Sequence, residues 1–488
     1  MDLVDLARPL RFAAATLLAI LSGSVAAEAT GPGDDPAVQG QIRVFSAWLD
    51  AQLAYRGIPG VVVGVVAGDE LVWAEGFGHA DVERGTPMAA DTRFRMASHS
   101  KLFTATAIMQ LREQGLVRLD DPVVDHLPWF EFEATEGDET PVTVEHLLTH
   151  ASGLPREAGT HWVDFDFPTA EDVRALMPER RAAYPPETRW KYSNLAYTLA
   201  GLIVEARSGE SWADYLQANV FDPLGMDASS VDVDDPRLAV GYGRRMPDGS
   251  REVLPFVDAR GMAAATGLTS TVEDMARFVS AQFREGERGD DRILSTASLR
   301  EMHRVRMLEN DWTRGQGIGF GVRRVNDRLY VGHGGGYPGY TTFTTIQLDD
   351  EVGVIVLTNT NDSGPAQIAD ELMKTVGAAV AEAAAAAEDA DEAVEWDPAW
   401  SRFAGLYRSR WGDVAVVELD EELALVRVTA PRIVAESRLV PLGDGRFRHE
   451  APTGGGPVGE VVHFEEVDGE VVRMHDGDTY LERVPASD

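Results

Sequence analysis

The sequence predicts an α+β protein in which an antiparallel sheet, built from N- and C-terminal strands, carries a helical region and is followed by a small, barrel-like all-β domain. Three observations predict this fold class. Apolar and β-branched runs of strand length occur at residues 60–77 and again at 318–359. Mainly helical periodicity separates them, and short apolar runs between Gly and Asp turn signals fill the C-terminal part of the chain. Strands at both ends of the first region imply one sheet assembled from both.

The first region begins with an amphipathic helix and a hairpin. Apolar residues recur every three or four positions over 36–56, and strand-like runs at 60–67 and 71–77 flank a turn at 68–70. Further helices are expected at 98–114, 144–150, 195–207 and 272–284. Further strands are expected at 318–324, 329–332, 341–347 and 352–359.

The 488 residues divide into four expected segments. These are a signal peptide at 1–27, a large domain at 28–380, a linker at 381–395 and a small domain at 396–488. The linker is predicted because alanine and acidic residues dominate it, which is typical of a helix that continues into a solvated connection. The evenly spaced short strands of the small domain, such as 414–419, 423–428, 461–464 and 471–474, favour a barrel or sandwich.

The first 27 residues have the pattern of an export signal. Arg8 and Arg11 precede an apolar run over 12–21, and the small residues 25–27 suit a signal peptidase, with cleavage expected after Ala27. Acidic residues within this leader are unusual, so a misplaced start codon or a retained N-terminal anchor are the alternatives. The mature protein is expected to be secreted or periplasmic.

Composition excludes several classes of function. The formal net charge is −36, which repels nucleic acid and anionic membrane surfaces. The chain contains no cysteine, which excludes disulfides, thiolate metal sites and a cysteine nucleophile. Only 3 of the 44 basic residues are lysines, and a saline habitat and codon bias explain this equally well. The reactive groups must therefore be hydroxyls, nitrogen bases or carboxylates.

A serine and a lysine three residues apart form the first candidate motif. Ser98 and Lys101 lie at the start of the expected helix 98–114, and residues three apart share a helix face. A serine hydroxyl is almost inert at neutral pH, and a lysine can accept its proton only if burial or nearby positive charge lowers the lysine pKa. Alone, the pair could be a surface serine and lysine. The intervening His99 and Ser100 are assigned no role.

A tyrosine and an asparagine form the second motif. Tyr192 and Asn194 come just before the helix expected at 195–207. Tyr192 can act as a general base or proton relay if nearby cations lower its pKa, and Asn194 can orient a substrate amide. Taken alone, a tyrosine before a helix is more often a packing residue.

The third motif is a histidine followed by three glycines. His333 precedes Gly334, Gly335 and Gly336 at the end of an expected strand. Glycines let the backbone approach a ligand closely, and their N–H groups can complete an oxyanion hole. In isolation, a glycine-rich turn is the simpler interpretation.

In this order and spacing, the three motifs resemble those of penicillin-binding proteins and serine β-lactamases, specifically the class C β-lactamase-like group. The resemblance covers residues 37–375 and implies the β-lactamase/transpeptidase-like fold. Two further segments, 144–155 and 265–275, look like the family's helix-and-turn and glycine-turn segments. The tail from Trp396 resembles the small, lipocalin-like β-barrel that is often appended to such hydrolases.

The resemblance implies acyl transfer through Ser98. Ser98 would form the acyl-enzyme, and Lys101 and Tyr192 would share the proton transfers, with the acylation base left open between them. Asn194 would hold a substrate side-chain carbonyl. The backbone N–H groups of Ser98 and Gly336 would form the oxyanion hole.

His333 is the main departure, because β-lactamases and many penicillin-binding proteins carry a lysine followed by Thr-Gly at this place. An imidazole attracts a substrate carboxylate less strongly than an ammonium group does, which argues against efficient β-lactamase activity. The candidate activities are esterase, D-amino-acid or D-Ala-D-Ala peptidase, and weak β-lactamase. A small-molecule or peptide substrate is expected, with cell-wall peptidoglycan as one source, and the oligomeric state is left open.

No metal or other cofactor is expected. His146 and His150 lie four residues apart on an expected helix, but no third ligand is indicated. The alternative to an enzyme is a non-catalytic protein that uses the same fold to bind peptidoglycan or a partner. The Ser98–Lys101 pair argues against it, because binding alone has no chemical need for the lysine.

Overall fold

The computed structural model describes residues 31–135, 137, 140–231, 235–283, 293–325, 328–392, 396–419, 422–428, 435–450 and 459–485. The chain forms two compact units, Met1–Ala384 and Ala385–Asp488, and each has a hydrophobic core of its own. The expected signal peptide, residues 1–27, lies outside the described residues.

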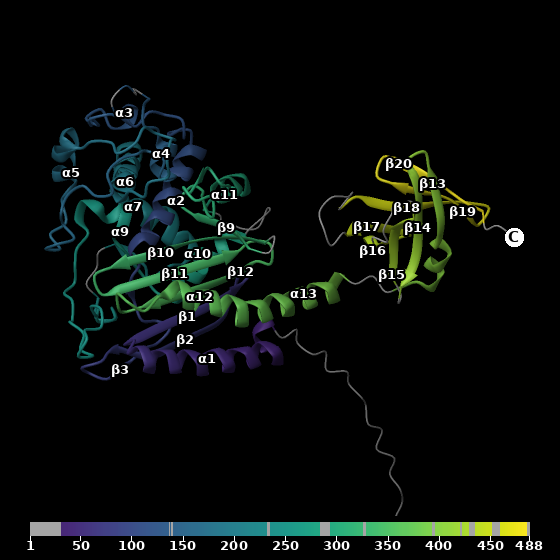
Figure 1. The fold of residues 1–488 in the computed structure, drawn as a ribbon, viewed down its shortest axis with the longest axis horizontal. Coiled ribbons are helices and arrows are strands. Elements are labelled where there is room, and N and C mark those ends of the chain that lie inside the picture. Colours follow the sequence, from purple (N-terminus) through teal and green to yellow (C-terminus); the bar gives the residue numbers. More distant parts are fainter. Residues whose placement is uncertain are drawn as a thin grey trace, which may run out of the picture. The chain divides into compact units, whose positions relative to one another are not determined.

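The large unit contains an antiparallel sheet assembled from both ends of its sequence (Figure 1). Within the described residues it has nine strands in the order β3-β2-β1-β12-β11-β10-β9-β8-β7. Its two halves meet where β1 pairs with β12, with Val61 opposite Thr358. The predicted sheet built from N- and C-terminal strands is therefore confirmed. The strands are β1 (Gly60–Ala67), β2 (Glu70–Asp81), β3 (Thr86–Pro87), β7 (Met307–Leu308), β8 (Gly315–Gln316), β9 (Gly321–Val325), β10 (Arg328–Tyr337), β11 (Tyr340–Gln347) and β12 (Val352–Thr358).

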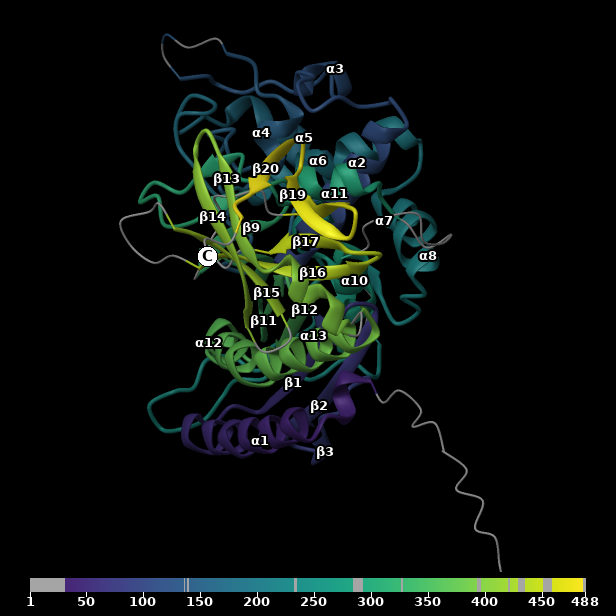
Figure 2. The same cartoon turned by 90° about the vertical axis from the view of Figure 1, so that its right-hand side faces the viewer.

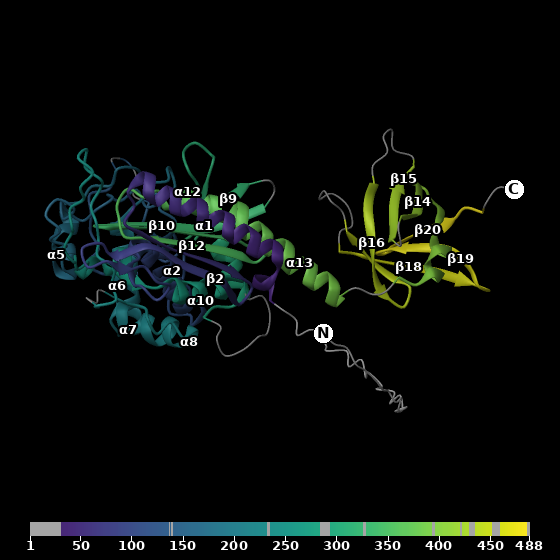
Figure 3. The ribbon, with the colours of Figure 1, turned by 90° about the horizontal axis from the view of Figure 1, so that it is seen from below.

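Each face of the sheet packs against its own group of helices. Val61 and Val63 of β1 pack with α1 (Pro36–Arg56) and α12 (Pro365–Leu372), whereas Val62 packs into the larger core on the other face. Figures 1 and 3 show α1 and α12 on the same side of the sheet. Successive strand residues point to opposite faces, so a central strand buried on both faces needs apolar residues throughout.

The helical region covers the other face of the sheet and contains a small second sheet in the order β4-β6-β5. The strands of this second sheet are β4 (Phe94–Arg95), β5 (Ser230–Val231) and β6 (Leu268–Ser270). The main helices of the region are α2 (Ser100–Glu113), α3 (Val123–His126), α4 (Val144–Leu148), α5 (Ala170–Leu176), α6 (Asn194–Ser208), α7 (Trp212–Leu216), α8 (Asp222–Leu224), α9 (Ala263–Thr266), α10 (Val272–Phe283) and α11 (Thr296–His303).

Three local expectations differ from the structure. The helix predicted to reach His150 ends at Leu148, and His150 has a left-handed backbone conformation (φ 57°) that an α-helix cannot contain. Ser98 lies in a 3₁₀ turn, Ala97–His99, just before α2. The histidine and glycines at 333–336 lie inside β10 rather than at the end of a strand.

The small unit is a closed barrel, which confirms the barrel-like domain expected from the sequence (Figure 2). Its described strands are β13 (Gly405–Ser409), β14 (Gly412–Leu419), β15 (Glu422–Arg427), β16 (Ala435–Gly443), β17 (Arg446–Glu450), β18 (Val461–Val467), β19 (Glu470–Asp476) and β20 (Thr479–Arg483). Tyr407, Leu423 and Phe447 are fully buried in its core, so side chains fill this interior. Helix α13 (Ala378–Glu392) occupies most of the segment expected to be a linker.

Among the residues that the structure describes, no helix is both long enough and apolar enough to cross a membrane.

Candidate active site

Ser98 lies on a short turn whose preceding residue, Met96, is hydrogen-bonded to a distant segment. The Met96 N–H donates to the Leu268 carbonyl at 2.8 Å, which holds the chain just before the turn. Ala97 has a left-handed backbone (φ 53°), which is uncommon for a residue with a Cβ atom and is typical of constrained sites. Ala97 and His99 are fully buried, whereas Ser98 between them is partly accessible. Of these three residues, only Ser98 is therefore accessible from outside the core.

Side chains from two further positions meet the Ser98 hydroxyl. Lys101 Nζ, one turn along the chain, lies 3.1 Å from Ser98 Oγ, and the Tyr192 hydroxyl donates to Ser98 Oγ at 2.8 Å. Tyr192 is held in place because the next residue, Ser193, caps α6 by accepting the Ala196 N–H at 3.0 Å. The structure thus brings together the three side chains that the sequence analysis selected as catalytic.

The Lys101 amine contacts two groups besides the Ser98 hydroxyl. Asn194 Oδ1 lies 2.8 Å and the Ala265 carbonyl 2.9 Å from Nζ, and both can only accept hydrogen bonds. A neutral amine gives its two hydrogens to these oxygens and keeps its lone pair for the Ser98 hydroxyl. Burial lowers the pKa of Lys101 well below its ordinary value, which favours this neutral form.

The condition under which Tyr192 could act as a general base, a pKa lowered by nearby cations, is not met. Burial raises the pKa of Tyr192, and this effect outweighs the hydrogen bond to Ser98 and the charge of Arg156, whose guanidinium lies 5.2 Å from the ring centroid. The phenol is therefore protonated at neutral pH. In the resting site it donates a hydrogen bond rather than accepting a proton.

Asn194 is held on both sides of its amide. Its Oδ1 accepts from Lys101, and its Nδ2 donates to Glu157 Oε1 at 2.7 Å. Burial by itself raises the pKa of Glu157, but hydrogen bonds, that from His161 first, outweigh it and the net shift is downward. The Glu157 side chain is ionised although it is only 15% exposed. The substrate contact expected of Asn194 therefore has only the remaining amide N–H available.

Charges around Lys101 act on its pKa in opposite directions. The Glu157 carboxylate raises the pKa of Lys101, whereas Arg156 lowers it, and both are smaller effects than burial. Arg156 Nε lies 3.2 Å from Glu157 Oε1, so the two charges partly compensate each other. Burial is thus the main cause of the lowered Lys101 pKa, and the charges of Arg156 and Glu157 modify it in opposite directions.

Strand β10 runs beside the turn that carries Ser98. Gly335 approaches it so closely that a Cβ atom there would lie 2.4 Å from the Met96 carbonyl oxygen. Strand β9 pairs with β10 only as far as Gly332, so β10 from His333 onward is paired with β11 alone in the described sheet. The free edge of β10 therefore lies next to Ser98.

His99, to which the sequence analysis assigned no role, links the Ser98 turn to β11. Its ring is fully buried, with Nε2 2.9 Å from Thr344 Oγ1 and Nδ1 3.0 Å from Thr342 Oγ1. Burial lowers the pKa of His99 to about 4, so the imidazole is neutral at neutral pH. The residue after the nucleophile thus ties the turn to the sheet through side-chain hydrogen bonds.

His333 is also neutral. Its Nδ1 donates to the Gly334 carbonyl at 2.6 Å, and its ring lies 6.2 Å from that of His99 and 6.3 Å from that of Tyr192, centroid to centroid. Burial, followed by the charges of neighbouring bases, lowers the pKa of His333 to about 3. The position therefore places no positive charge beside Ser98 at neutral pH.

Four residues at the site were not selected from the sequence: Arg156, Glu157, His150 and Trp190. His150 packs its ring 4.3 Å from that of Tyr192, and its Nδ1 accepts the Ser193 N–H at 3.2 Å. It lies within the family-like segment 144–155, and that segment was a usable signal. The other three are single residues in loops, where no periodic pattern marks them.

His146 and His150 do not form a metal pair. His146 Nδ1 accepts the Thr143 N–H at 3.1 Å and its Nε2 lies 3.0 Å from Glu187 Oε1, whereas His150 contacts Ser193. Across the described ranges of the chain, no group of three or more acidic or histidine side chains could hold a metal ion.

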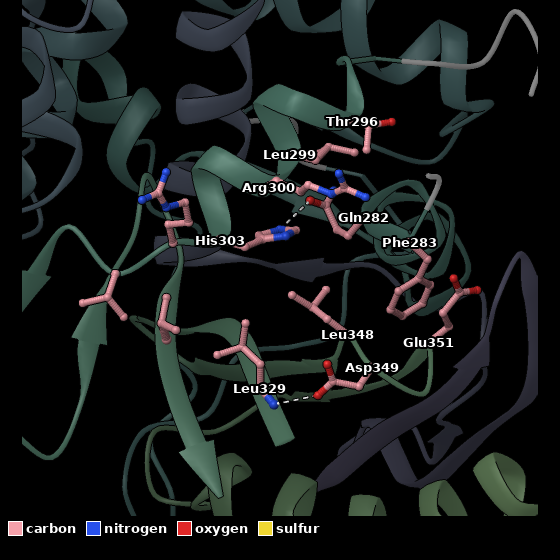
Figure 4. A pocket seen from close by; sticks show the side chains of 13 residues that line it. Gln282, Phe283, Thr296, Leu299, Arg300, His303, Leu329, Leu348, Asp349 and Glu351 are labelled. Carbon is pink, nitrogen blue, oxygen red and sulfur yellow. Dashed lines mark hydrogen bonds between the residues drawn. The ribbon is translucent and has the colours of Figure 1, made fainter. Parts of the chain in front are cut away.

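Two hollows differ in their relation to Ser98. A groove of about 310 Å³ is lined by Tyr192 and His333 among others, and so adjoins the site. A larger cavity of about 710 Å³ lies between α10, α11 and the start of β10 (Figure 4). It contains His303, whose Nε2 lies 3.3 Å from Gln282 Oε1, and none of the predicted site residues lines it. The smaller hollow is the one next to the reactive groups.

The geometry defines the class of the site. A partly exposed serine hydroxyl lies between a buried neutral amine and a protonated phenol, beside the free edge of a strand rich in glycine. This arrangement suits nucleophilic acyl transfer by serine, with the amine and phenol moving protons and backbone N–H groups available to an oxyanion. The fold and the site are those of a serine hydrolase.

The chain belongs to the beta-lactamase family, whose family model, "Beta-lactamase", matches residues 45–378. It is 32% identical over 372 residues to Esterase EstB of Burkholderia gladioli, covering 67% of this chain and 93% of that relative. It is 30% identical over 319 residues to Penicillin-binding protein 4* of Bacillus subtilis (strain 168), covering 62% of this chain and 68% of the relative.

A solved structure with the same fold extends over most of this chain. The octameric penicillin-binding protein homologue from Pyrococcus abyssi matches with a TM-score of 0.61 and 25% identity, covering 90% of this chain and 99% of that one. The predicted family and fold class are confirmed.

Proposed function

We propose that the protein is an exported esterase that cleaves uncharged carboxylic esters through an acyl-enzyme on Ser98. The observation that carries the proposal is the hydrogen-bonded group of Ser98, Lys101 and Tyr192 beside a neutral His333. The similarity to an esterase over 93% of that relative's length supports the choice of ester cleavage.

Acylation begins with the neutral Lys101 amine. It accepts the Ser98 hydroxyl proton as Oγ attacks the ester carbonyl carbon, and the carbonyl oxygen becomes an oxyanion held by the N–H groups of Ser98 and Gly336. Collapse breaks the bond to the alcohol oxygen, which takes the Tyr192 proton. Tyr192 then recovers a proton from the Lys101 ammonium group. Lys101 is therefore the acylation base, because the raised Tyr192 pKa leaves no phenolate to serve.

Deacylation repeats these proton movements with water. A water molecule attacks the acyl carbon while its proton passes through Tyr192 to Lys101. The departing Ser98 oxygen takes that proton back, which releases the acid and restores the resting site.

The charges at the site favour uncharged substrates. Arg156 is engaged with Glu157 at 3.2 Å, and Lys191 donates to the Leu154 carbonyl at 2.9 Å. His333, at the position next to Ser98 on β10, is neutral. We expect β-lactams and D-Ala-D-Ala peptides of peptidoglycan, which carry a carboxylate, to react more slowly than uncharged esters.

The test compares the wild type with Ser98→Ala by intact-protein mass spectrometry. Each protein is incubated with 4-nitrophenyl acetate, a fluorophosphonate, a penicillin and a D-Ala-D-Ala peptide. We expect adducts from the first two reagents that depend on Ser98, slow or no adduct from the last two, and an unchanged thermal transition for the folded variant. Ester turnover retained by Ser98→Ala would overturn the assignment. Faster acylation by the penicillin than by the acetate would overturn the preference for uncharged esters.

Export is proposed from the sequence of the first 27 residues alone. Expression of the full chain with its own N-terminus, followed by N-terminal sequencing of extracellular or periplasmic protein, tests it. A mature N-terminus directly after Ala27 is expected, and protein that stays in the cytoplasm with its leader intact would contradict it.

A further inference from the structure

The groove that adjoins Tyr192 and His333 is formed in part by the α12 side of strand β10. Alternate residues share a face of a strand, so Tyr330, Gly332 and Gly334 of β10 all face α12. Neither glycine has a side chain, but only Gly334 leaves room, because a Cβ atom on Gly332 would lie 2.1 Å from the Thr344 carbonyl oxygen. Phe343 of β11 lies directly opposite Gly334, and a Cβ atom on Gly334 would lie 3.0 Å from its ring. The groove exists because β10 presents no side chain there.

Aromatic side chains form much of the wall of this groove. Trp190, Tyr330 and Phe343 line it, and Ala366 of α12 contributes only a methyl group. The volume of about 310 Å³ is at the lower end of the range of ligand pockets and accommodates a phenyl or naphthyl group. Aromatic walls favour an aromatic occupant, because edge-to-face and offset contacts add to the burial of apolar surface.

The charged residues of the lining balance one another. Arg323 is paired with Asp370 at 2.8 Å. Glu309 and Arg314, the other two charged residues of the lining, carry opposite charges. An ionic ligand would find no surplus of opposite charge in this set. The lining therefore favours an uncharged occupant.

The groove reaches the reacting atoms from the Tyr192 side. It continues past the end of the β9–β10 pairing at Gly332 to Tyr192 and His333, which line its near part. Asn194, whose Oδ1 accepts from the Lys101 amine, and Glu157, which accepts from the Asn194 amide, do not line it. Of the groups at Ser98, the groove is therefore continuous with the one that gives a proton to the departing oxygen.

We propose that this groove is the subsite for the leaving alcohol and that it accepts uncharged aromatic alcohol groups. The proposal rests on the proposed function, since it assigns a substrate part to the same acyl-transfer site. Tyr192 protonates the alcohol oxygen as the bond to the acyl carbon breaks, so that oxygen and the group attached to it must lie on the Tyr192 side. The position of Gly334, where β10 has no side chain, gives that group a place to lie between β10 and α12.

The test separates the alcohol from the acyl part of the ester. Hydrolysis of ethyl acetate, 2-phenylethyl acetate and ethyl 3-phenylpropanoate is followed by pH-stat titration. The two aliphatic alcohols have similar acidity, so the ring changes binding and not the chemistry of departure. We expect kcat/KM for 2-phenylethyl acetate to exceed that for ethyl acetate by about tenfold or more, and the acyl-side ring to give a smaller gain.

A filling variant and a matched control locate the effect. Ala366→Trp places a ring inside the groove and is expected to reduce the preference for 2-phenylethyl acetate to about twofold or less, with Ala366→Leu intermediate. Gln367→Trp adds the same ring at the next residue of α12, which is exposed and does not line the groove, and should keep the wild-type preference. Thermal unfolding identifies any variant that fails to fold, and Ala366→Leu then carries the comparison.

The outcomes distinguish the subsite from the activity. Ester hydrolysis without a preference for the aromatic alcohol, or a preference that survives both Ala366 variants, overturns the subsite and leaves the esterase proposal standing. A preference found only with ethyl 3-phenylpropanoate assigns the groove to the acyl group instead and also overturns it. Absence of both acetyl-enzyme and ester turnover in the wild type overturns the proposed function itself.

Discussion

Gly334 and Gly335, neighbours on strand β10 that face opposite sides of the sheet, differ in how closely protein atoms approach them. On the face toward Ser98, a Cβ atom on Gly335 would lie 2.4 Å from the Met96 carbonyl oxygen and 2.3 Å from Thr342 Oγ1. On the α12 face, a Cβ atom on Gly334 would approach the Phe343 ring to 3.0 Å, which can rotate, and would lie 3.6 Å from the Thr342 carbonyl oxygen, an ordinary contact. Glycine thus serves two purposes in one motif. At Gly335 it permits the backbone contact that positions the nucleophile, and at Gly334 it leaves space for a ligand.

The largest expected effect is that of adding one methyl group at Gly335, on the face of β10 toward Ser98. Gly335→Ala should lower kcat/KM for 4-nitrophenyl acetate by about 100-fold or more, because the Ser98 turn must move away from β10 and the oxyanion donors separate. Gly334→Ala, the neighbouring substitution on the α12 face, should lower kcat/KM by less than about tenfold. Steady-state kinetics with thermal unfolding of both variants measure this, and equal losses would break the distinction between the faces.

The next largest effect is expected from replacing His99, which links the Ser98 turn to β11. His99→Phe keeps the ring but removes its hydrogen bonds to Thr342 and Thr344, so kcat should fall about tenfold with little change in KM. His99→Asn, which can restore one hydrogen bond, should recover part of kcat. His303→Phe is the matched control, because this buried histidine lies outside the site and its loss should affect stability without lowering kcat. A parallel loss of kcat in the control would contradict the positioning role.

The free energy of unfolding depends on pH because the His99 imidazole is buried in its neutral form. The pKa of His99 is about 4 in the folded protein and 6.5 in the unfolded chain, so its contribution is complete above pH 6.5 and is lost as the pH falls toward 4. The free energy of unfolding should decrease by about 1 kcal/mol per pH unit for this histidine. Urea unfolding between pH 7.5 and 5 should show a shallower dependence for His99→Phe than for the wild type. Identical slopes would show that His99 is not buried in the neutral form.

The smallest effect is on the pH dependence of the reaction itself, set by charges outside β10. Glu157 raises the pKa of Lys101 and Arg156 lowers it. Acylation needs the neutral amine, so kcat/KM rises with pH through the Lys101 pKa. Glu157→Gln should move this rise to lower pH, and Arg156→Gln should move it to higher pH. Shifts in the same direction for both variants would contradict Lys101 as the base.

Much of the fold and the reactive group followed from local sequence patterns. The helices at 36–56, 195–207 and 272–284 appear as α1, α6 and α10 with ends within one residue, because amphipathic periodicity and capping are local properties. Ser98 and Lys101 could be paired because three residues of helical chain bring their side chains together. The helix at 144–150 was predicted too long because no periodic pattern marks the left-handed backbone of His150.

The remaining features of the site depended on contacts between distant segments. Glu157 and Arg156 are single loop residues whose effect on Lys101 arises only when that loop folds against α2 and α6. The sequence left the direction of the Tyr192 pKa shift open, because the burial that raises this pKa depends on contacts between distant segments.

The sequence by itself determined the order of the elements and the Ser98–Lys101 pair, because side-chain periodicity and short spacings are local. The resemblance of its three motifs to a known family added the family and Tyr192. The tertiary structure alone decided which of those groups is charged and where a substrate can lie. A pKa depends on desolvation by residues remote in the chain, and a groove depends on which strands pair and where pairing stops. The end of the β9–β10 pairing at Gly332 and the position of α12 beside Gly334 are such long-range features, and together they place the groove next to Tyr192 and His333.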